Sequence, residues 1–266
     1  MNEPRNPYAP PNAQVTTHDQ GQGSPESGTF VPYGRPLPVG RGPAWIGDAW
    51  RILKAQPGMW AAALILIFAA WIILQKIPIL NIIAGILMPF VIAAIALAAN
   101  QQKRTGTFEL KTLLGGFEKH PMPLLGVGLT TLLSSVVLAI VLAFFLGTDI
   151  VWSMTADGIL DPSTLLTPKF WLAFLVGFLV MLPIAFATYL APQLIVLHNQ
   201  PPIEAMKMSL AGCVKNILPG IVFLICAMLL IFVSIIPLML GLLITMPIMA
   251  LTSYTVYRDI FVEEDA

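Results

Sequence analysis

Residues 216–257 read NILPGIVFLICAMLLIFVSIIPLMLGLLITMPIMALTSYTVY, and none of these 42 residues is charged. Uncharged apolar runs of about 18 residues or more are typical of membrane-spanning helices, because a soluble core rarely hides so much apolar surface. The run is about twice as long as one crossing needs, and Pro237 offers a natural place to turn. The stretch therefore predicts two membrane-spanning helices that are divided between Ser234 and Pro237.

The rest of the chain has the same character. Hydrophobic residues make up 57% of the sequence and charged residues only 11%, whereas roughly a quarter of the residues in soluble domains are charged. Between Ala55 and Gln102 the only charged residue is Lys76. The sequence thus predicts an all-α integral membrane protein with six transmembrane helices. The four further spans are expected at about residues 58–76, 80–100, 121–146 and 170–197.

The basic residues are distributed unevenly between the two sides that six spans create. Twelve of the 14 Lys and Arg residues fall in the N-terminal segment, the 101–120 and 198–215 loops and the C-terminal segment. The opposite side holds only Lys76 and Lys169. Because basic loops tend to stay in the cytoplasm, this asymmetry predicts that the N-terminus and the C-terminus are both cytoplasmic.

An amphipathic segment precedes the first, third and fifth expected spans. The three segments read AWIGDAWRILKAQPGMW (44–60), TFELKTLLGGFEKHPMPLL (107–125) and PIEAMKMSLAGCVKNILPGI (202–221). Each has apolar residues at helical spacing on one face and charged residues on the other. We expect three cytoplasmic helices that lie in the plane of the membrane, each followed by a transmembrane hairpin. These units restart on the same side and so form three parallel repeats. The predicted repeats are 43–100, 105–197 and 202–258.

The segments that flank this membrane domain, residues 43–260, are different. Residues 1–42 are rich in Pro, Gly, Gln, Asn, Ser and Thr, and such a composition buries too little apolar surface to offset the chain entropy. We expect a disordered, Pro-rich cytoplasmic tail there, either a solvated leader or a docking segment, and no signal-peptide pattern is present. Residues 261–266 form a short acidic cytoplasmic end.

Two groups of side chains are candidate contacts in these elements. Trp, Lys and Arg suit the headgroup region, where an in-plane helix inserts its apolar face. The candidate lipid and interface contacts are Trp45, Trp50, Arg51, Lys54, Lys111, Lys119, Lys207 and Lys215. The candidate polar contacts within the membrane are Thr188, Tyr189, Thr252 and Tyr254. Two alternatives stay open, since the in-plane helices could pack against neighbouring loops and hydroxyls within spans often bond to their own helix.

No chemical motif accompanies this architecture. His18, His120 and His198 are widely separated in the sequence and lack further ligands at the spacing that a metal site needs. Cys213 and Cys226 do not form a CxxC pair. The sequence contains no phosphate-binding glycine loop, nucleophile elbow or HExxH motif. We therefore expect a non-enzymatic protein with no catalytic residue, no cofactor, no metal and no nucleic-acid partner.

Three segments carry a family resemblance: APQLIVLHNQPPIEAMKMSLAGCVKN (191–216), DAWRILKAQPGMW (48–60) and SYTVYRDIF (253–261). They resemble uncharacterised bacterial inner-membrane proteins with six spans, which are distantly similar to the membrane domain of some glycerophosphodiester phosphodiesterases. The resemblance covers about residues 43–260. The matching positions are Ala191, Pro192, Ala205, Ser209 and Asn216. The resemblance implies a location in the bacterial inner membrane. The sequence shows no soluble phosphodiesterase domain, so that activity does not transfer.

These features favour a membrane-embedded organising or accessory protein. Such a protein would act through membrane lipids at its in-plane helices and through partners within the bilayer, either another membrane protein or a second copy of this chain. The alternative function is a channel or carrier for a small neutral or lipid-like molecule. Coupling to protons is disfavoured, because the expected spans contain no carboxylate.

Overall fold

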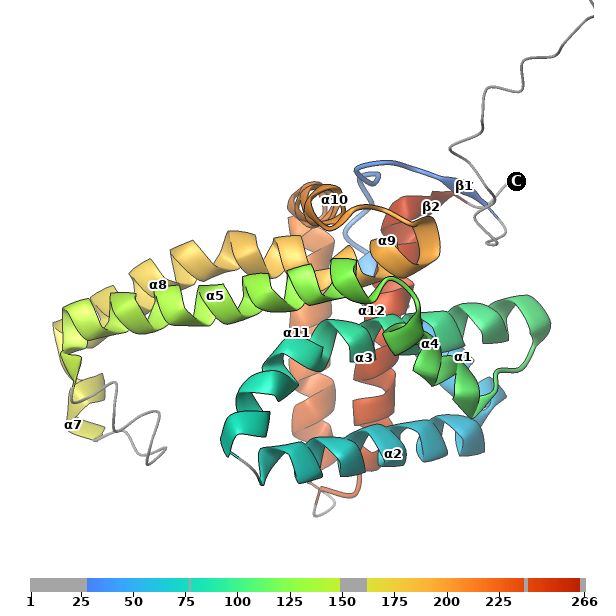
Figure 1. The fold of residues 1–266 in the computed structure, drawn as a ribbon, viewed down its shortest axis with the longest axis horizontal. Helices are drawn as coiled ribbons and strands as arrows, with labels where there is room; N and C mark the ends of the chain where they lie inside the picture. Colours follow the sequence, from blue (N-terminus) through green and yellow to red (C-terminus); the bar gives the residue numbers. More distant parts are fainter. Residues whose placement is uncertain (1–27, 77, 149–161, 237–238, 264–266) are drawn as a thin grey trace, which may run out of the picture.

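The structure is a computed structural model, and it describes residues 28–76, 78–148, 162–236 and 239–263. Helices form nearly all of this part of the chain (Figure 1). The helices are α1 (Arg41–Ala55), α2 (Pro57–Gln75), α3 (Pro78–Thr105), η1 (Leu110–Leu114), α4 (Gly115–Glu118), α5 (Pro121–Leu146), α7 (Pro162–Leu165), α8 (Pro168–Tyr189), α9 (Ala191–His198), α10 (Pro202–Lys215), α11 (Ile217–Ile235) and α12 (Leu242–Phe261). Strands β1 (Thr29–Phe30) and β2 (Val262–Glu263) pair in antiparallel fashion.

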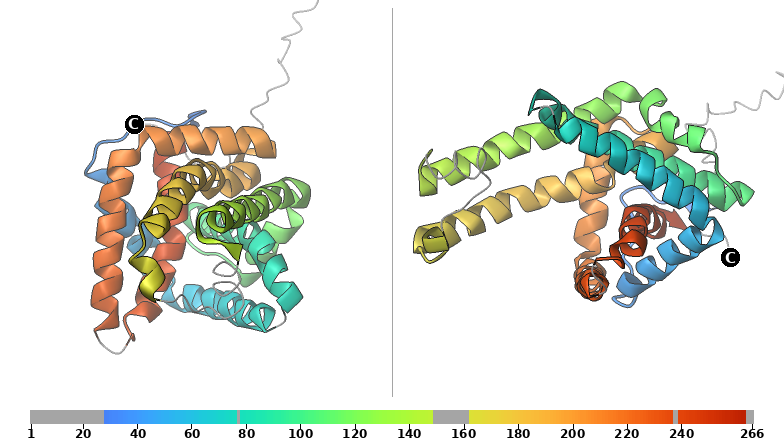
Figure 2. Two further views of the ribbon diagram at one scale, coloured as in Figure 1. Left: turned by 90° about the vertical axis from the view of Figure 1, so that its left-hand side faces the viewer. Right: turned by 90° about the horizontal axis from the view of Figure 1, so that it is seen from below.

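Three helical hairpins extend from one compact region. The hairpins are α2–α3, α5–α8 and α11–α12, and they leave the compact region in different directions (Figures 1 and 2). We call that region the base: it consists of α1, α9, α10 and the ends of α3 and α12. The buried apolar core lies in the base. It includes Trp45, Ala49, residues 93–99 of α3, residues 194–197 of α9 and much of the second half of α12.

Five helices among the described residues are long and apolar enough to cross a membrane. They are Pro57–Gln75, Ala84–Thr105, Pro121–Leu146, Pro168–His198 and Ile217–Ile235. Only 0–17% of the most apolar stretch is buried in four of them, compared with 61% in Ala84–Thr105. So many exposed Leu, Ile and Phe side chains require a lipid environment. The chain is therefore an all-helical membrane protein with several membrane-spanning helices.

α12 differs from these five helices. Its second half carries Thr252, Ser253, Thr255 and Arg258 and is mostly buried inside the base. These polar residues lower its hydropathy, so the helix is not among the five that meet the length and composition of a span. The sixth expected span stays a prediction, and the turn expected at Pro237 lies outside the described residues.

The helix expected at 170–197 is interrupted at Leu190, where α8 gives way to α9. The Leu190 N–H donates to the Ser209 hydroxyl of α10 (3.0 Å), and that hydroxyl donates to the Phe186 carbonyl (2.6 Å). Leu190 would otherwise bond to this carbonyl, so Ser209 enters the helical ladder and bends the chain. Pro192 follows and lacks an N–H of its own. The span expected at 170–197 is confirmed as the apolar stretch Pro168–His198, and the bend within it brings α9 into the core of the base.

The in-plane helix expected within 107–125 does not form as one helix. The chain instead makes the 3₁₀ helix η1 and the single turn α4. Gly116 packs so closely on α3 that a Cβ there would lie 2.5 Å from the Phe90 carbonyl oxygen. Phe108 is buried whereas Phe117 is exposed, so the apolar side chains do not share one face. By contrast, α1 and α10 confirm the helices expected within 44–60 and 202–221.

Gln193 provides a test of packing in the base. Its side chain is fully buried in α9, and neither amide atom has a hydrogen-bond partner among the described residues. Burial of an unpaired amide costs about 1–3 kcal/mol. We expect Gln193→Leu to raise the thermal unfolding midpoint of the full chain in detergent micelles.

A second buried glutamine serves as the control. The Gln102 amide accepts from Trp60 Nε1 (2.7 Å) and donates to the Ile52 carbonyl (2.9 Å), which links α1, α2 and α3. The same substitution at Gln102 should lower the midpoint, because it leaves the buried indole N–H without its acceptor. A lower midpoint for Gln193→Leu would show that the Gln193 amide bonds to a buried water molecule instead.

Candidate functional site

An N-terminal strap, residues 28–40, runs across one face of the base. Its β1 strand pairs with β2, and the Val31 N–H donates to the Phe261 carbonyl (2.8 Å). Lys215 donates to the Gly34 carbonyl (2.9 Å). The Asn216 side chain accepts from the Leu37 N–H (2.8 Å). The expectation of disorder over 1–42 is therefore wrong for residues 28–42, and residues 1–27 lie outside the described part of the chain. Backbone pairing with a distant segment orders a stretch whose composition alone does not.

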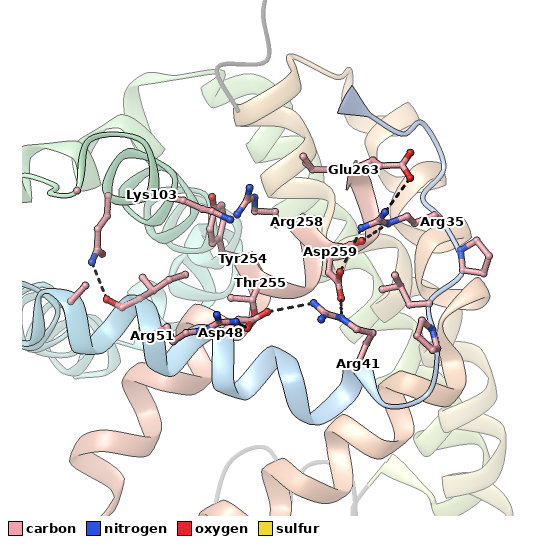
Figure 3. A pocket seen from close by; sticks show the side chains of 18 residues that line it. Arg35, Arg41, Asp48, Arg51, Lys103, Tyr254, Thr255, Arg258, Asp259 and Glu263 are labelled. Atoms are coloured by element: carbon pink, nitrogen blue, oxygen red, sulfur yellow. Dashed lines mark hydrogen bonds and ion pairs between the residues drawn. The ribbon is translucent and has the colours of Figure 1, made fainter. Parts of the chain in front are cut away.

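Asp259, near the end of α12, joins the strap to α1. Its Oδ2 accepts from Arg41 Nε and from Trp45 Nε1, each at 2.7 Å. Arg35 of the strap donates from Nε to the Asp259 carbonyl (3.0 Å) and places Nη2 3.7 Å from Oδ1. Figure 3 shows both arginines pointing toward this carboxylate. A mostly buried carboxylate is stable here because two guanidinium groups and an indole N–H satisfy it.

A cleft of about 910 Å³ opens beside this network, between the strap, α1, the end of α3 and the end of α12 (Figure 3). The cations that line it are Arg35, Arg41, Arg51, Lys103 and Arg258. The carboxylates that line it are Asp48, Asp259 and Glu263. Among the described residues of the lining there are five cations and three carboxylates, an excess positive charge of two. The chain thus gathers basic residues from four separate segments around one hollow, which favours an anionic occupant.

The carboxylates of the cleft are already engaged by its arginines. Asp48 lies 3.5 Å from Arg41 and also pairs with Arg51 on the same helix. Glu263 lies 3.4 Å from Arg35. Arg51 and Glu263 are largely exposed, so these two outer pairs are weak and exchange easily with other partners. The ion pairs of Arg35 and Arg41 with the mostly buried Asp259 carboxylate hold the strap, α1 and α12 together.

The predicted interface residues are dispersed over the base and the η1–α4 segment. Trp45 is buried, with its ring against Phe223 of α11, so it contacts protein rather than lipid. Trp50 and Lys54 are exposed on α1. Two of the lysines form ion pairs within their own segments: Lys111 with Glu109 (2.7 Å) and Lys207 with Glu204 (3.5 Å). Lys119 is exposed, and Lys215 donates to the strap. Arg51 lines the cleft.

The predicted polar contacts within the membrane have ordinary structural roles or other positions. The Thr188 hydroxyl donates to the Ile184 carbonyl (2.9 Å), and the Thr252 hydroxyl donates to the Met249 carbonyl (2.6 Å). Tyr189 is partly exposed at the end of α8. Tyr254 is buried and lines the cleft. The geometry therefore brings Tyr254 and Arg51 to one site and leaves the other predicted residues elsewhere.

Sequence reasoning missed Asp259 as well as the cations Arg35, Arg41, Lys103 and Arg258 as members of one site. One signal was available: Asp259 is the only acidic residue between Glu204 and Glu263. A lone carboxylate beyond a long uncharged run marks a place where opposite charges must meet. Which cations it meets depends on the fold, because Arg35 and Arg41 lie more than 200 residues away in the chain.

The attachment of the strap should depend on pH. The Tyr33 hydroxyl donates to the Glu204 carboxylate, and this hydrogen bond lowers the pKa of Glu204 below its ordinary value of 4.5. A carboxyl group whose folded pKa is depressed contributes stability above its unfolded pKa and loses it as the pH falls through the folded pKa. We expect the protection factors for amide hydrogen exchange in the strap to fall below pH 4.5 in the wild type.

Tyr33→Phe removes the donor and should abolish most of this pH dependence while exchange at neutral pH rises slightly. Glu204→Gln, which keeps the shape but not the charge, should behave in the same way. An equal loss of protection at low pH in the wild type and in Tyr33→Phe would assign the pH dependence to another group.

Within the described residues, no three His, Cys, Asp or Glu side chains lie close enough to hold a metal ion. Comparison with protein-family models, with curated proteins and with solved structures finds no match to this chain.

Proposed function

We propose that this chain is a six-span protein of the bacterial inner membrane that performs no catalysis and acts as an organising or accessory protein, through lipids and intramembrane partners. The observation that carries the proposal is the exposure of the hairpins. The most apolar stretch of α5 contains no buried residue, and α5 buries only Leu124, Val127 and Gly128 near its start. Hairpins that diverge from a common base leave wide apolar flanks for lipid, for another membrane protein or for a second copy.

The course of α12 supports the sixth span. Its first half is apolar and exposed: Leu243, Ile244 and Met246 have exposed fractions of 75%, 53% and 60%. This half packs beside α11, which is apolar enough to cross a membrane. In the proposed topology α12 crosses with α11 and then continues into the base, so that the basic segments and both termini share the cytoplasmic side.

A shared pattern in the three hairpins supports the parallel repeats. The second helix of each hairpin has an internal proline: Pro89 in α3, Pro183 in α8 and Pro247 in α12. In each case a buried segment follows that proline by a few residues: residues 93–100, 190–197 and 251–258. The base is then built from three equivalent segments, one from each repeat.

The hydroxyl groups of the hairpins support an organising role over a solute path. Thr130, Thr131 and Ser234 each donate to the carbonyl four residues earlier in their own helix. Such bonds satisfy the hydroxyl without a substrate. The Ser234 and Thr245 hydroxyls also lie 2.5 Å apart, which joins α11 to α12. These hydroxyl groups stabilise the helices and their pairing, which favours a structural role over a path for a solute.

The test is mass spectrometry of the full chain extracted from its own membrane together with the surrounding lipid. A protein or lipid should co-purify at fixed stoichiometry with the wild type and with Thr188→Ala, whose hydroxyl bonds only within α8. It should be lost from Trp50→Ala/Lys54→Ala, which alters the exposed face of α1. Retention by the double variant would overturn the proposal. Solute flux in reconstituted vesicles that depends on Tyr189 and Tyr254 would establish a carrier instead.

A further inference from the structure

The charged cleft beside Asp259 has the composition of a phosphate site. Three of its five cations are arginines whose carboxylate partners lie in the same cleft: Arg35, Arg41 and Arg51. A guanidinium group binds two phosphate oxygens with the same fork geometry that it uses for a carboxylate. A phosphate group can therefore take the place of the weakly held outer carboxylates without any new arrangement of the arginines.

Burial makes one wall of the cleft stronger than an exposed basic patch. Arg258 is only 9% exposed, and Tyr254 and Thr255 on the same turn of α12 are also buried. A cation held at low exposure interacts more strongly with an anion, because less water screens the charges. Lys103 approaches from α3 on the same side of the cleft as Arg258 (Figure 3).

The cleft also lies close to the surface that faces lipid. Ile52 and Ala55, near the end of α1, line the cleft, and α2 begins directly afterwards at Pro57. Ile65 and Phe68, two to three turns further along α2, are more than 60% exposed. A molecule with a phosphate in the cleft thus has an apolar helix beside it along which acyl chains can lie.

We propose that this cleft binds the phosphate group of an anionic phospholipid. The proposal rests on the membrane location in the proposed function and deepens it by naming the lipid class. The described residues of the lining include more cations than carboxylates, which favours the single negative charge of a phospholipid phosphodiester. Arg51, Lys103 and Arg258 bind the phosphate, while Asp259 holds Arg35 and Arg41 at the rim.

The experiment uses the full chain in nanodiscs that contain phosphatidylcholine with or without phosphatidylglycerol. Native mass spectrometry counts the lipids that stay bound as the collision energy rises. Wild-type protein should retain one phosphatidylglycerol molecule. Arg51→Gln/Lys103→Gln should reduce that retention by about tenfold or more, because two charge-assisted contacts are lost. These two residues do not bond to Asp259, so the inner network stays intact.

Lys111→Gln/Lys119→Gln is the matched control, because it removes the same charge from residues that do not line the cleft. Its retention should equal that of the wild type. Equal losses in both double variants would show a general surface charge effect and overturn the proposal, as would full retention by the cleft variant.

Titration with inorganic phosphate in pure phosphatidylcholine nanodiscs separates the two sources of phosphate. A rise in the thermal midpoint that the cleft variant abolishes, without retention of phosphatidylglycerol, would assign the site to a soluble phosphate and overturn the lipid proposal. The proposed function fails separately, through the Trp50→Ala/Lys54→Ala test. Neither Trp50 nor Lys54 lines the cleft.

Discussion

Replacement of Asp259 by alanine is expected to lower the thermal unfolding midpoint of the full chain in nanodiscs by roughly 10 °C. The substitution leaves Arg41 and the buried Trp45 indole without the acceptor that each reaches at 2.7 Å. Removal of one partner from a buried charge network costs about 3–5 kcal/mol, because the remaining charges stay desolvated. Loss of the Asp259 carboxylate should release the N-terminal strap first, because Arg35 of the strap forms an ion pair with it.

Differential scanning fluorimetry measures the midpoint, and limited proteolysis within residues 28–40 reports release of the strap. Glu263→Ala is the control, because this exposed carboxylate contacts only the outer side of Arg35 at 3.4 Å. Its midpoint should stay within about 1–2 °C of the wild type. If Asp259→Ala and Glu263→Ala behaved alike, the network around Asp259 would not hold the strap to α12.

Two glycines of α1 should respond to alanine with opposite signs. A Cβ on Gly42 would lie 2.4 Å from the Pro219 carbonyl oxygen and 2.8 Å from the Phe223 nitrogen of α11. Backbone atoms cannot rotate away, so α1 must separate from α11, at a cost of about 1–3 kcal/mol or more. The separation also weakens the edge contact between Trp45 and Phe223, whose ring centroids are 5.8 Å apart. We expect Gly42→Ala to lower the midpoint markedly.

Gly47 is the matched site in the same helix, since a Cβ there meets nothing within 4 Å. Gly47→Ala should stabilise the protein by about 0.5–1 kcal/mol, because alanine loses less backbone entropy than glycine when a helix forms. Scanning fluorimetry of both variants under one condition gives the comparison. A neutral or stabilising Gly42→Ala would show that α1 and α11 do not approach as closely as the structure has them.

The sequence predicts the elements whose causes are local. Long uncharged runs predict the apolar helices, and helical spacing of apolar residues predicts α1 and α10. The bend at Leu190 depends on a hydroxyl that is 19 residues away in the sequence. The strap depends on pairing with the far end of the described chain. Neither contact produces a periodic pattern in its own segment, so the pattern predicts neither the bend within the fourth span nor the order of residues 28–42.

The candidate site was less predictable than the fold. The position of Arg51 on a helix face and that of Tyr254 within a span predict contacts, and both residues line the cleft. The same pattern predicts contacts for Lys111 and Lys207, which pair with carboxylates of their own segments instead. Net charge per segment predicts which side of a membrane is basic, but only the packing of α1 against α12 decides which basic residues meet.

The pairing of β1 with β2 also constrains the order of events during synthesis. Thr29 and Glu263 are direct partners although 234 residues separate them. At the usual rate of translation, tens of seconds pass between the emergence of these two residues from the ribosome. The early hairpins can therefore enter the membrane one at a time. During this period Arg35, Arg41 and Trp45 lack the Asp259 carboxylate, which has not yet been synthesised. Assembly of the base is then the last step, because its charge network is complete only after Asp259 has been synthesised.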